Sequence, residues 1–222
     1  MKKKIILSVL VFLIGVLMVG CSEEKMDVSS GWEIIMSNSK QTLDNDLKKV
    51  FEDAKKTSEE KLDYIALLAK QVVAGTNYMF LCKDSDSYKV IVIYKDLEGN
   101  SKIINVTDFN PIGYINSDKE VSFEQLAGGW YVSIPDENIT IDSTVNNYFE
   151  KATETLTGAS YYPISVLAEQ KKSGTDYALL CYGEGSYSGS MAGIYMLTLH
   201  IDKDDNPEIA SISAIDLTDF NE

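Results

Sequence analysis

The sequence contains no arginine, one histidine, three cysteines and only four prolines in 222 residues. Because all 20 basic residues are lysines and 34 residues are acidic, the formal charge is −14. Such a charge argues against nucleic acid as a partner and against loose adsorption to anionic lipid, since both are polyanions. With a single histidine, His200, neither a metal cluster nor a nucleophile–base pair stands out. We therefore expect no catalytic residues, no metal, no cofactor and no enzymatic activity.

The first 20 residues have the pattern of a secretory signal. Lysines at positions 2–4 precede an uncharged, almost unbroken apolar run over residues 5–19, which is short for a membrane-spanning helix. Gly20 and Cys21 follow, and this ending resembles the lipobox of bacterial lipoproteins, whose cysteine receives a diacylglyceryl group. The resemblance implies cleavage after residue 20, lipidation of Cys21 and a lipid-anchored, extracytoplasmic protein at the bacterial cell membrane or surface. The alternative is an ordinary signal peptide with an unused cysteine.

Residues 21–30 are short, polar and charged, as expected of a tether. Without the leader, 17 lysines remain against 34 acids, so the mature chain carries a formal charge of −17. This charge favours solubility and is compatible with electrostatic steering of a basic protein partner.

The rest of the chain repeats one pattern of residues. Gly31-Trp32 recurs as Gly129-Trp130, and residues 75–82 recur 99 positions later as residues 174–181. Residues 106–109 also resemble residues 217–220, a shift of 111 that predicts about 12 extra residues in the second copy. The repeat predicts two homologous domains, over residues 31–115 and 127–222, joined by a linker over residues 116–126.

Each copy is expected to fold as a strand, a helix and four further strands. In the first copy, extended runs over residues 64–73, 76–83, 88–94 and 102–109 are separated by turns, two of which contain glycine, a pattern typical of antiparallel hairpins. A helix cannot bury its apolar face alone, so we expect an α+β fold with one helix packed across a four- to five-stranded antiparallel sheet. The expected apolar helix faces contain Leu43, Leu47, Val50, Phe51 and Ala54 in the first copy, and Val145, Phe149, Ala152 and Leu156 in the second.

Residues 71–78, Gln-Val-Val-Ala-Gly-Thr-Asn-Tyr, resemble the first hairpin loop of cystatins, which inhibit papain-like cysteine proteases. The family signature is Gln-x-Val-x-Gly, and the match continues through Thr-Asn-Tyr as in the stefin branch. The resemblance covers nearly all of residues 30–112 and extends through the repeat to residues 127–222. It therefore implies two tandem cystatin-like domains.

Cystatins insert three segments side by side into the protease cleft: an N-terminal glycine segment and two hairpin loops. The resemblance implies that this chain is a monomeric, membrane-anchored inhibitor of a papain-like cysteine protease. In the second copy Lys172 stands where the first has Val73, so we expect that loop to be structural only. The implied protease-binding residues are Gly31, Gln71, Val72, Val73, Ala74, Gly75, Leu97, Glu98 and Gly99.

The residues also allow a second interpretation, in which the same fold serves as a non-inhibitory cell-envelope module that binds an envelope or host protein or a peptide. Cys82 and Cys181 occupy equivalent strand positions, and we expect both to be buried and unpaired. The cluster of Asp202, Asp204 and Asp205 lacks the ligand spacing of a calcium loop and indicates an exposed hairpin turn.

Overall fold

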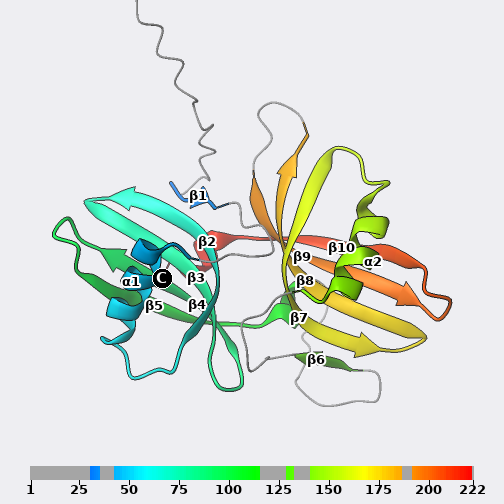
Figure 1. Ribbon diagram of the computed structural model, residues 1–222, viewed down its shortest axis with the longest axis horizontal. Coiled ribbons are helices and arrows are strands. Elements are labelled where there is room, and N and C mark those ends of the chain that lie inside the picture. The colour runs from blue at the N-terminus through cyan, green and yellow to red at the C-terminus, as the bar shows by residue number, and fades with distance from the viewer. Residues whose placement is uncertain (1–30, 36–42, 116–128, 133–140, 187–191, 222) are drawn as a thin grey trace, which may run out of the picture.

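The computed structural model describes residues 31–35, 43–115, 129–132, 141–186 and 192–221. It is an α+β protein with two five-stranded antiparallel sheets and two α-helices (Figure 1). The predicted signal peptide, Cys21, the tether and the linker all lie outside the described residues. No helix in these ranges is long and apolar enough to cross a membrane.

The same order of elements occurs twice, in a first half over residues 31–115 and a second half over residues 129–221. The sheets have strand orders β1-β2-β3-β4-β5 and β10-β9-β8-β7-β6. The predicted order of strand, helix and four strands is thus observed in both halves, and each half ends in a short 3-10 helix. The elements are β1 (Glu33–Ile34), α1 (Asn45–Lys55), β2 (Asp63–Val73), β3 (Gly75–Lys83), β4 (Tyr88–Lys95), β5 (Ser101–Phe109) and η1 (Pro111–Tyr114), then β6 (Trp130–Val132), α2 (Ser143–Thr153), β7 (Ala159–Lys171), β8 (Gly174–Gly185), β9 (Gly193–Asp202), β10 (Pro207–Ile215) and η2 (Leu217–Phe220).

Both helices begin at an aspartate that caps the first turn. The carboxylate of Asp44 accepts the backbone N–H of Leu47 at 2.8 Å, and that of Asp142 accepts the N–H of Thr144 at 2.8 Å. The helices then bury most of the predicted apolar faces, with Leu47 and Ala152 half-buried. Leu43 is buried but lies just before α1, and Leu156 lies beyond the end of α2 and is 37% exposed. The prediction for Leu156 is wrong because the helix ends at Thr153, before the apolar spacing does. The buried helix residues are Val50, Phe51, Ala54, Val145 and Phe149.

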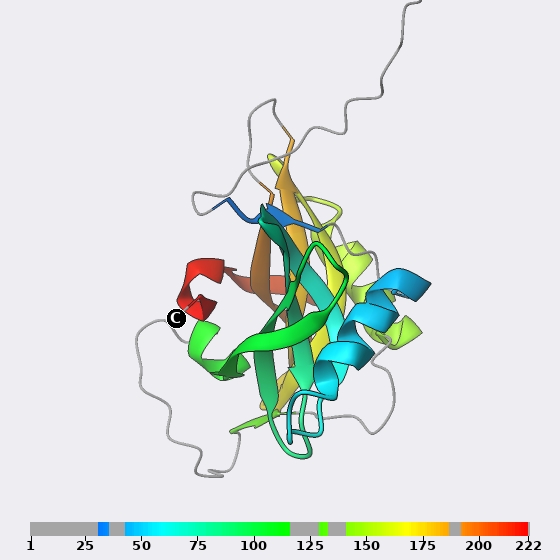
Figure 2. The same ribbon diagram turned by 90° about the vertical axis from the view of Figure 1, so that its left-hand side faces the viewer.

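The two sheets pack back to back, and α1 and α2 cover their outer faces (Figures 1 and 2). One apolar cluster contains side chains from both sheets and forms a core that the halves share, and each half has a further apolar cluster of its own beneath its helix. Each sheet is therefore buried on both faces, which explains why its central strands are almost continuously apolar. The shared core includes Met79, Leu81, Val90 and Val92 from the first half and Ala178, Leu180, Ile194 and Met196 from the second.

Each 3-10 helix packs against the other half. η1 contacts β6, β7 and β10, while η2 contacts β4 and β5. The amide of Asn105 donates to the carbonyl of Phe220 at 2.7 Å, and the rings of Phe109 and Phe220 lie 6.1 Å apart. The indole N–H of the buried Trp32 donates to the side chain of Asn221 at 3.0 Å. This reciprocal exchange has the form of a two-fold interface built within one chain.

The register of the repeat differs from the prediction at its C-terminal end. Residues 106–109 form the end of β5, whereas residues 217–220 form η2, so the two Thr-Asp-Phe segments are not equivalent. Asp96 and Asn100 in the first half form the same kind of turn as Asp202 and Asn206 in the second. The sequence shift between the two halves at this turn is therefore 106 residues rather than 111. Because the shift at Gly75 and Gly174 is 99, the second half has seven extra residues between these points rather than 12.

Trp32 gives a test of the shared core. It is 1% exposed and joins the first half to the C-terminus of the second, so Trp32→Ala should lower the free energy of unfolding by about 3–5 kcal/mol. Tyr131→Ala, at a position that is 63% exposed, should change it by less than about 0.5 kcal/mol. Urea unfolding followed by circular dichroism measures both, and equal losses in the two variants would contradict the assigned role of Trp32.

Candidate functional site

Three segments of the first half meet at one end of its sheet, and we call them together the turn edge. They are Gly31, the β2–β3 turn over residues 71–75 and the β4–β5 turn over residues 96–100. The two turns are neighbours because β3 pairs with β4, with Thr76 opposite Lys95. Gly31 lies beside the β2–β3 turn, because β1 pairs with β2 at Lys70. All nine residues predicted to contact a protease therefore lie in or beside these turns, and the two turns are at the left in Figure 1.

The β2–β3 turn is tight and presents two valines to solvent. Gly75 adopts φ +130°, and a Cβ there would overlap the carbonyl oxygen of Lys95, so only glycine fits. The hydroxyl of Tyr94 donates to the carbonyl of Ala74 at 2.5 Å, which ties the tip of the turn to β4. Val72 is 74% exposed and Val73 is 44% exposed. The turn thus holds an apolar tip in one conformation.

Gln71 supports the turn from below. Its side-chain oxygen accepts a hydrogen bond from the amide of Asn77 at 2.8 Å, across the base of the hairpin. Gly31, with φ +74°, lies near the side-chain amide of Gln71, close enough that an added Cβ would be 3.9 Å from its nitrogen. Since the next residue, Trp32, is buried in the shared core, the position of Gly31 is set by the packing of the two halves.

The β4–β5 turn is held by Asp96. Its carboxylate accepts both the backbone N–H and the side-chain amide of Asn100, at 2.7 and 2.9 Å. These hydrogen bonds lower the pKa of the Asp96 carboxyl, so it is ionised at neutral pH. Gly99 takes φ +91° at the tip, and Leu97 beside it is 82% exposed. The second turn therefore also presents an apolar side chain on an ordered backbone.

The chemistry of the turn edge is that of a binding surface. Val72, Val73 and Leu97 are three of the seven exposed large hydrophobic side chains in the described part of the chain. Glu98 is the acidic residue at its tip, and it is exposed. The described ranges contain no group of three or more His, Cys, Asp or Glu side chains that could hold a metal ion. The arrangement can bind a partner by burying apolar surface against it.

The equivalent edge of the second half lies at the opposite end of the molecule and is polar (Figure 1). Lys172 is exposed, with its ammonium 3.9 Å from the carboxylate of Asp176. That carboxylate is also 2.5 Å from Nδ1 of His200. Asp202 repeats the role of Asp96 by accepting both N–H groups of Asn206 at 2.9 Å, so the acidic cluster is an exposed hairpin turn, as predicted.

Cys82 and Cys181 are buried and unpaired, as predicted. They lie in different cores, beneath α1 and α2 respectively. Burial raises the pKa of both thiols, so neither is a reactive thiolate at neutral pH.

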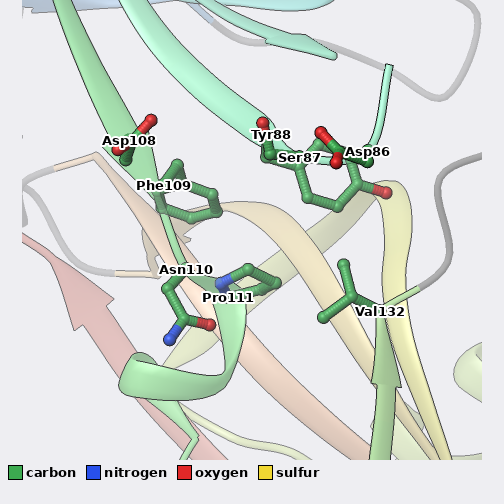
Figure 3. A pocket seen from close by; sticks show the side chains of 8 residues that line it. All are labelled: Asp86, Ser87, Tyr88, Asp108, Phe109, Asn110, Pro111 and Val132. Atoms are coloured by element: carbon green, nitrogen blue, oxygen red, sulfur yellow. The ribbon is translucent and has the colours of Figure 1, made fainter. Parts of the chain in front are cut away.

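Sequence reasoning missed a pocket of about 330 Å³ between the halves, at the end of the first sheet opposite to the turn edge (Figure 3). It forms where the β3–β4 turn and the end of β5 meet Val132 of β6, so only the packing of the halves creates it. Asp108 beside it is paired with Lys89 at 2.8 Å. The residues that line the pocket are Asp86, Ser87, Tyr88, Asp108, Phe109, Asn110, Pro111 and Val132.

Tyr94, Asn77, Asp96 and Asn100 hold the two turns but were not among the predicted site residues. Asn77 lies in the segment that resembles the cystatin loop, and the sequence signal for the other three was their position near the glycine turns. Comparison with known proteins adds no further residue: the chain matches no protein-family model, no curated protein and no solved structure.

Two glycine substitutions test the turn geometry. Both Gly75 and Gly99 have positive φ, so replacement by alanine should cost each turn about 1–2 kcal/mol. Gly75→Ala should cost more than Gly99→Ala, because only at Gly75 would the new methyl group overlap backbone, whereas nothing lies within 4 Å at Gly99. Chemical unfolding of the two variants measures the difference, and a smaller loss for Gly75→Ala would refute the described turn.

Proposed function

We propose that this protein is a membrane-anchored lipoprotein with two tandem cystatin-like domains that inhibits papain-like cysteine proteases through the turn edge of its first half. The observation that carries the proposal is the gathering of Gly31, residues 71–75 and residues 97–99 at one solvent-exposed edge. These are the three segments that the cystatin resemblance assigns to protease contact.

The physical basis of inhibition would be desolvation of a preordered apolar wedge. Val72, Val73 and Leu97 are exposed in the free protein, and each Å² of apolar surface buried in a cleft contributes about 25 cal/mol. Both turns are held by hydrogen bonds, from Tyr94 to Ala74 and from Asn100 to Asp96, so little conformational entropy is lost on binding. A closed hairpin blocks the cleft by occupying it, without any catalytic group.

The second half would act as a structural companion. Its equivalent tip carries Lys172 at the position of Val73, and burying an unpaired ammonium in an apolar cleft costs several kcal/mol. Its contribution would be the shared core, which positions Trp32 and hence Gly31.

An inhibition assay against a panel of papain-like enzymes tests the proposal. The chain from residue 22 onward, which contains every described residue, should inhibit at least one of them. Val73→Asp should weaken inhibition by about a hundredfold or more, because it buries an unpaired carboxylate in the cleft. Gly75→Glu should weaken it as well, since it disrupts the turn.

Lys172→Asp is the control, because it places an aspartate at the equivalent turn position at the opposite end of the molecule and should leave the inhibition constant unchanged. No inhibition at micromolar concentration, or equal potency of Val73→Asp and the parent chain, would rule out a wedge at the turn edge.

We further propose that Cys21 carries the lipid that anchors the protein. The support is the sequence alone: a basic start, an apolar run and a small residue before the cysteine. Expression of the full chain in a bacterium with labelled palmitate should give a labelled protein in the membrane fraction, and Cys21→Ser should lose both label and sedimentation with membranes. Labelling of the Cys21→Ser variant would show that the acceptor is another residue.

A second candidate is a non-inhibitory envelope module that binds a protein or peptide. It is favoured by the pocket between the halves, for which a wedge inhibitor has no use (Figure 3). Capture of envelope or host proteins on the immobilised chain distinguishes the two. This candidate predicts a partner without protease activity that remains bound to the Val73→Asp variant, whereas inhibition predicts a protease that the variant releases.

A further inference from the structure

Among the four strands at the sheet edges in the described part of the chain, β10 has the longest run of residues without charge. β1 and β6 have two and three residues, and β5 carries Lys102 and Asp108 near its two ends. Short strands and charged residues are the usual protection of an edge, whose free N–H and C=O groups can otherwise pair with another strand. β10 is nine residues long, and residues 209–215 within it carry no charge.

The uncharged segment of β10 reads the same in both directions. Its sequence is Ile-Ala-Ser-Ile-Ser-Ala-Ile, with Ile212 at the centre. Ile212 is 36% exposed, and Ala210 and Ala214 on either side of it are exposed. An antiparallel pair of identical strands brings each residue opposite the residue at the same distance on the other side of the centre. In a palindromic strand, each residue of this pair therefore faces a residue of the same type.

We propose that β10 pairs with β10 of a second copy of this chain, antiparallel and centred on Ile212. Ile212 then faces its own counterpart, Ser211 faces Ser213 of the second copy, and Ala210 faces Ala214 of the second copy. Side chains directly opposite in such a pair lie about 4.5–5.5 Å apart at Cβ, so the isoleucines touch. The hydroxyl of Ser211, which donates to the hydroxyl of Thr198 at 2.9 Å, can accept a hydrogen bond from Ser213 of the second copy. The two second-half sheets form one continuous ten-stranded sheet.

The dimer is closed, because the same edge is used on both copies and no second long uncharged edge is available in the described residues to extend it. It is also weak. A β-bulge between Ile209 and Ser211 limits the regular ladder on one side of the centre. At the ends of the paired segment Glu208 lies near Asp216 of the second copy, and these like charges repel. The proposed dimer differs from the monomer that we expected from the sequence.

The repulsion predicts how association responds to salt. Because the mature chain carries a formal charge of −17 and acids flank the pairing, added salt screens the repulsion and should strengthen the dimer. Association driven by attraction between opposite charges would weaken instead.

Sedimentation equilibrium of the chain from residue 22 onward tests the proposal across a wide range of protein concentration, at low and high salt. The expected result is a monomer–dimer equilibrium that shifts toward dimer with salt. Ile212→Lys should weaken it by at least about tenfold, because two ammonium groups would face each other. Ile104→Lys is the matched control, on the equivalent edge strand β5 at a position that is 49% exposed, and should leave it unchanged.

A mixture of variants tests the two-fold centre itself. Ile212→Lys and Ile212→Glu should each be monomeric alone and should form a one-to-one dimer when mixed, which also shows that both are folded. A wild-type chain that stays monomeric at every concentration and salt, an equal effect of Ile104→Lys, or variants that do not associate when mixed would each overturn the proposal.

Discussion

The packing of the two sheets against each other is the interaction on which the rest of the structure depends. Met79, Leu81 and Val92 of the first sheet and Leu180, Met196 and Ile194 of the second lie in one apolar cluster. Once these faces are buried together, the helices can cover only the outer faces, and the turns of each sheet are left at opposite ends. Because the hydrophobic effect is not directional, the 3-10 helices and Trp32 supply the polar contacts that set the alignment.

The two ends of the molecule have the same turn backbone but different side chains. Both hairpin ends use a glycine at positive φ and an aspartate that holds an asparagine four residues later. On that common backbone the first half presents Val72, Val73 and Leu97, whereas the second presents lysines and aspartates. A scaffold made rigid by a shared core can thus carry one apolar tip and one charged tip, and only the apolar tip suits a cleft without charge partners.

Local patterns predicted the elements well, since helix and strand depend on short-range spacing. The hairpins around Gly75 and Gly99 and the helix containing Phe51 are observed where expected. The failures arose where a residue's setting depends on distant contacts. Residues 217–220 match residues 106–109 by sequence, yet they form a 3-10 helix against the other half, where Phe220 packs on Phe109. Leu156 continued an apolar spacing beyond the end of its helix.

The sequence by itself determined the α+β class and the two copies, because hydrophobic periodicity and turn glycines act within a few residues along the chain. The nine predicted residues of the turn edge came from the resemblance of residues 71–78 to the cystatin loop. Only the tertiary structure decided that the copies share a core, that Gly31 is positioned through Trp32 and Asn221, and that a pocket lies between the halves. It also decided which strands lie at the border of each sheet, and β10 with its uncharged palindrome is one of them. Contacts between residues more than a hundred positions apart produce no periodic pattern in the sequence. They form only when both faces of each sheet are packed against other elements.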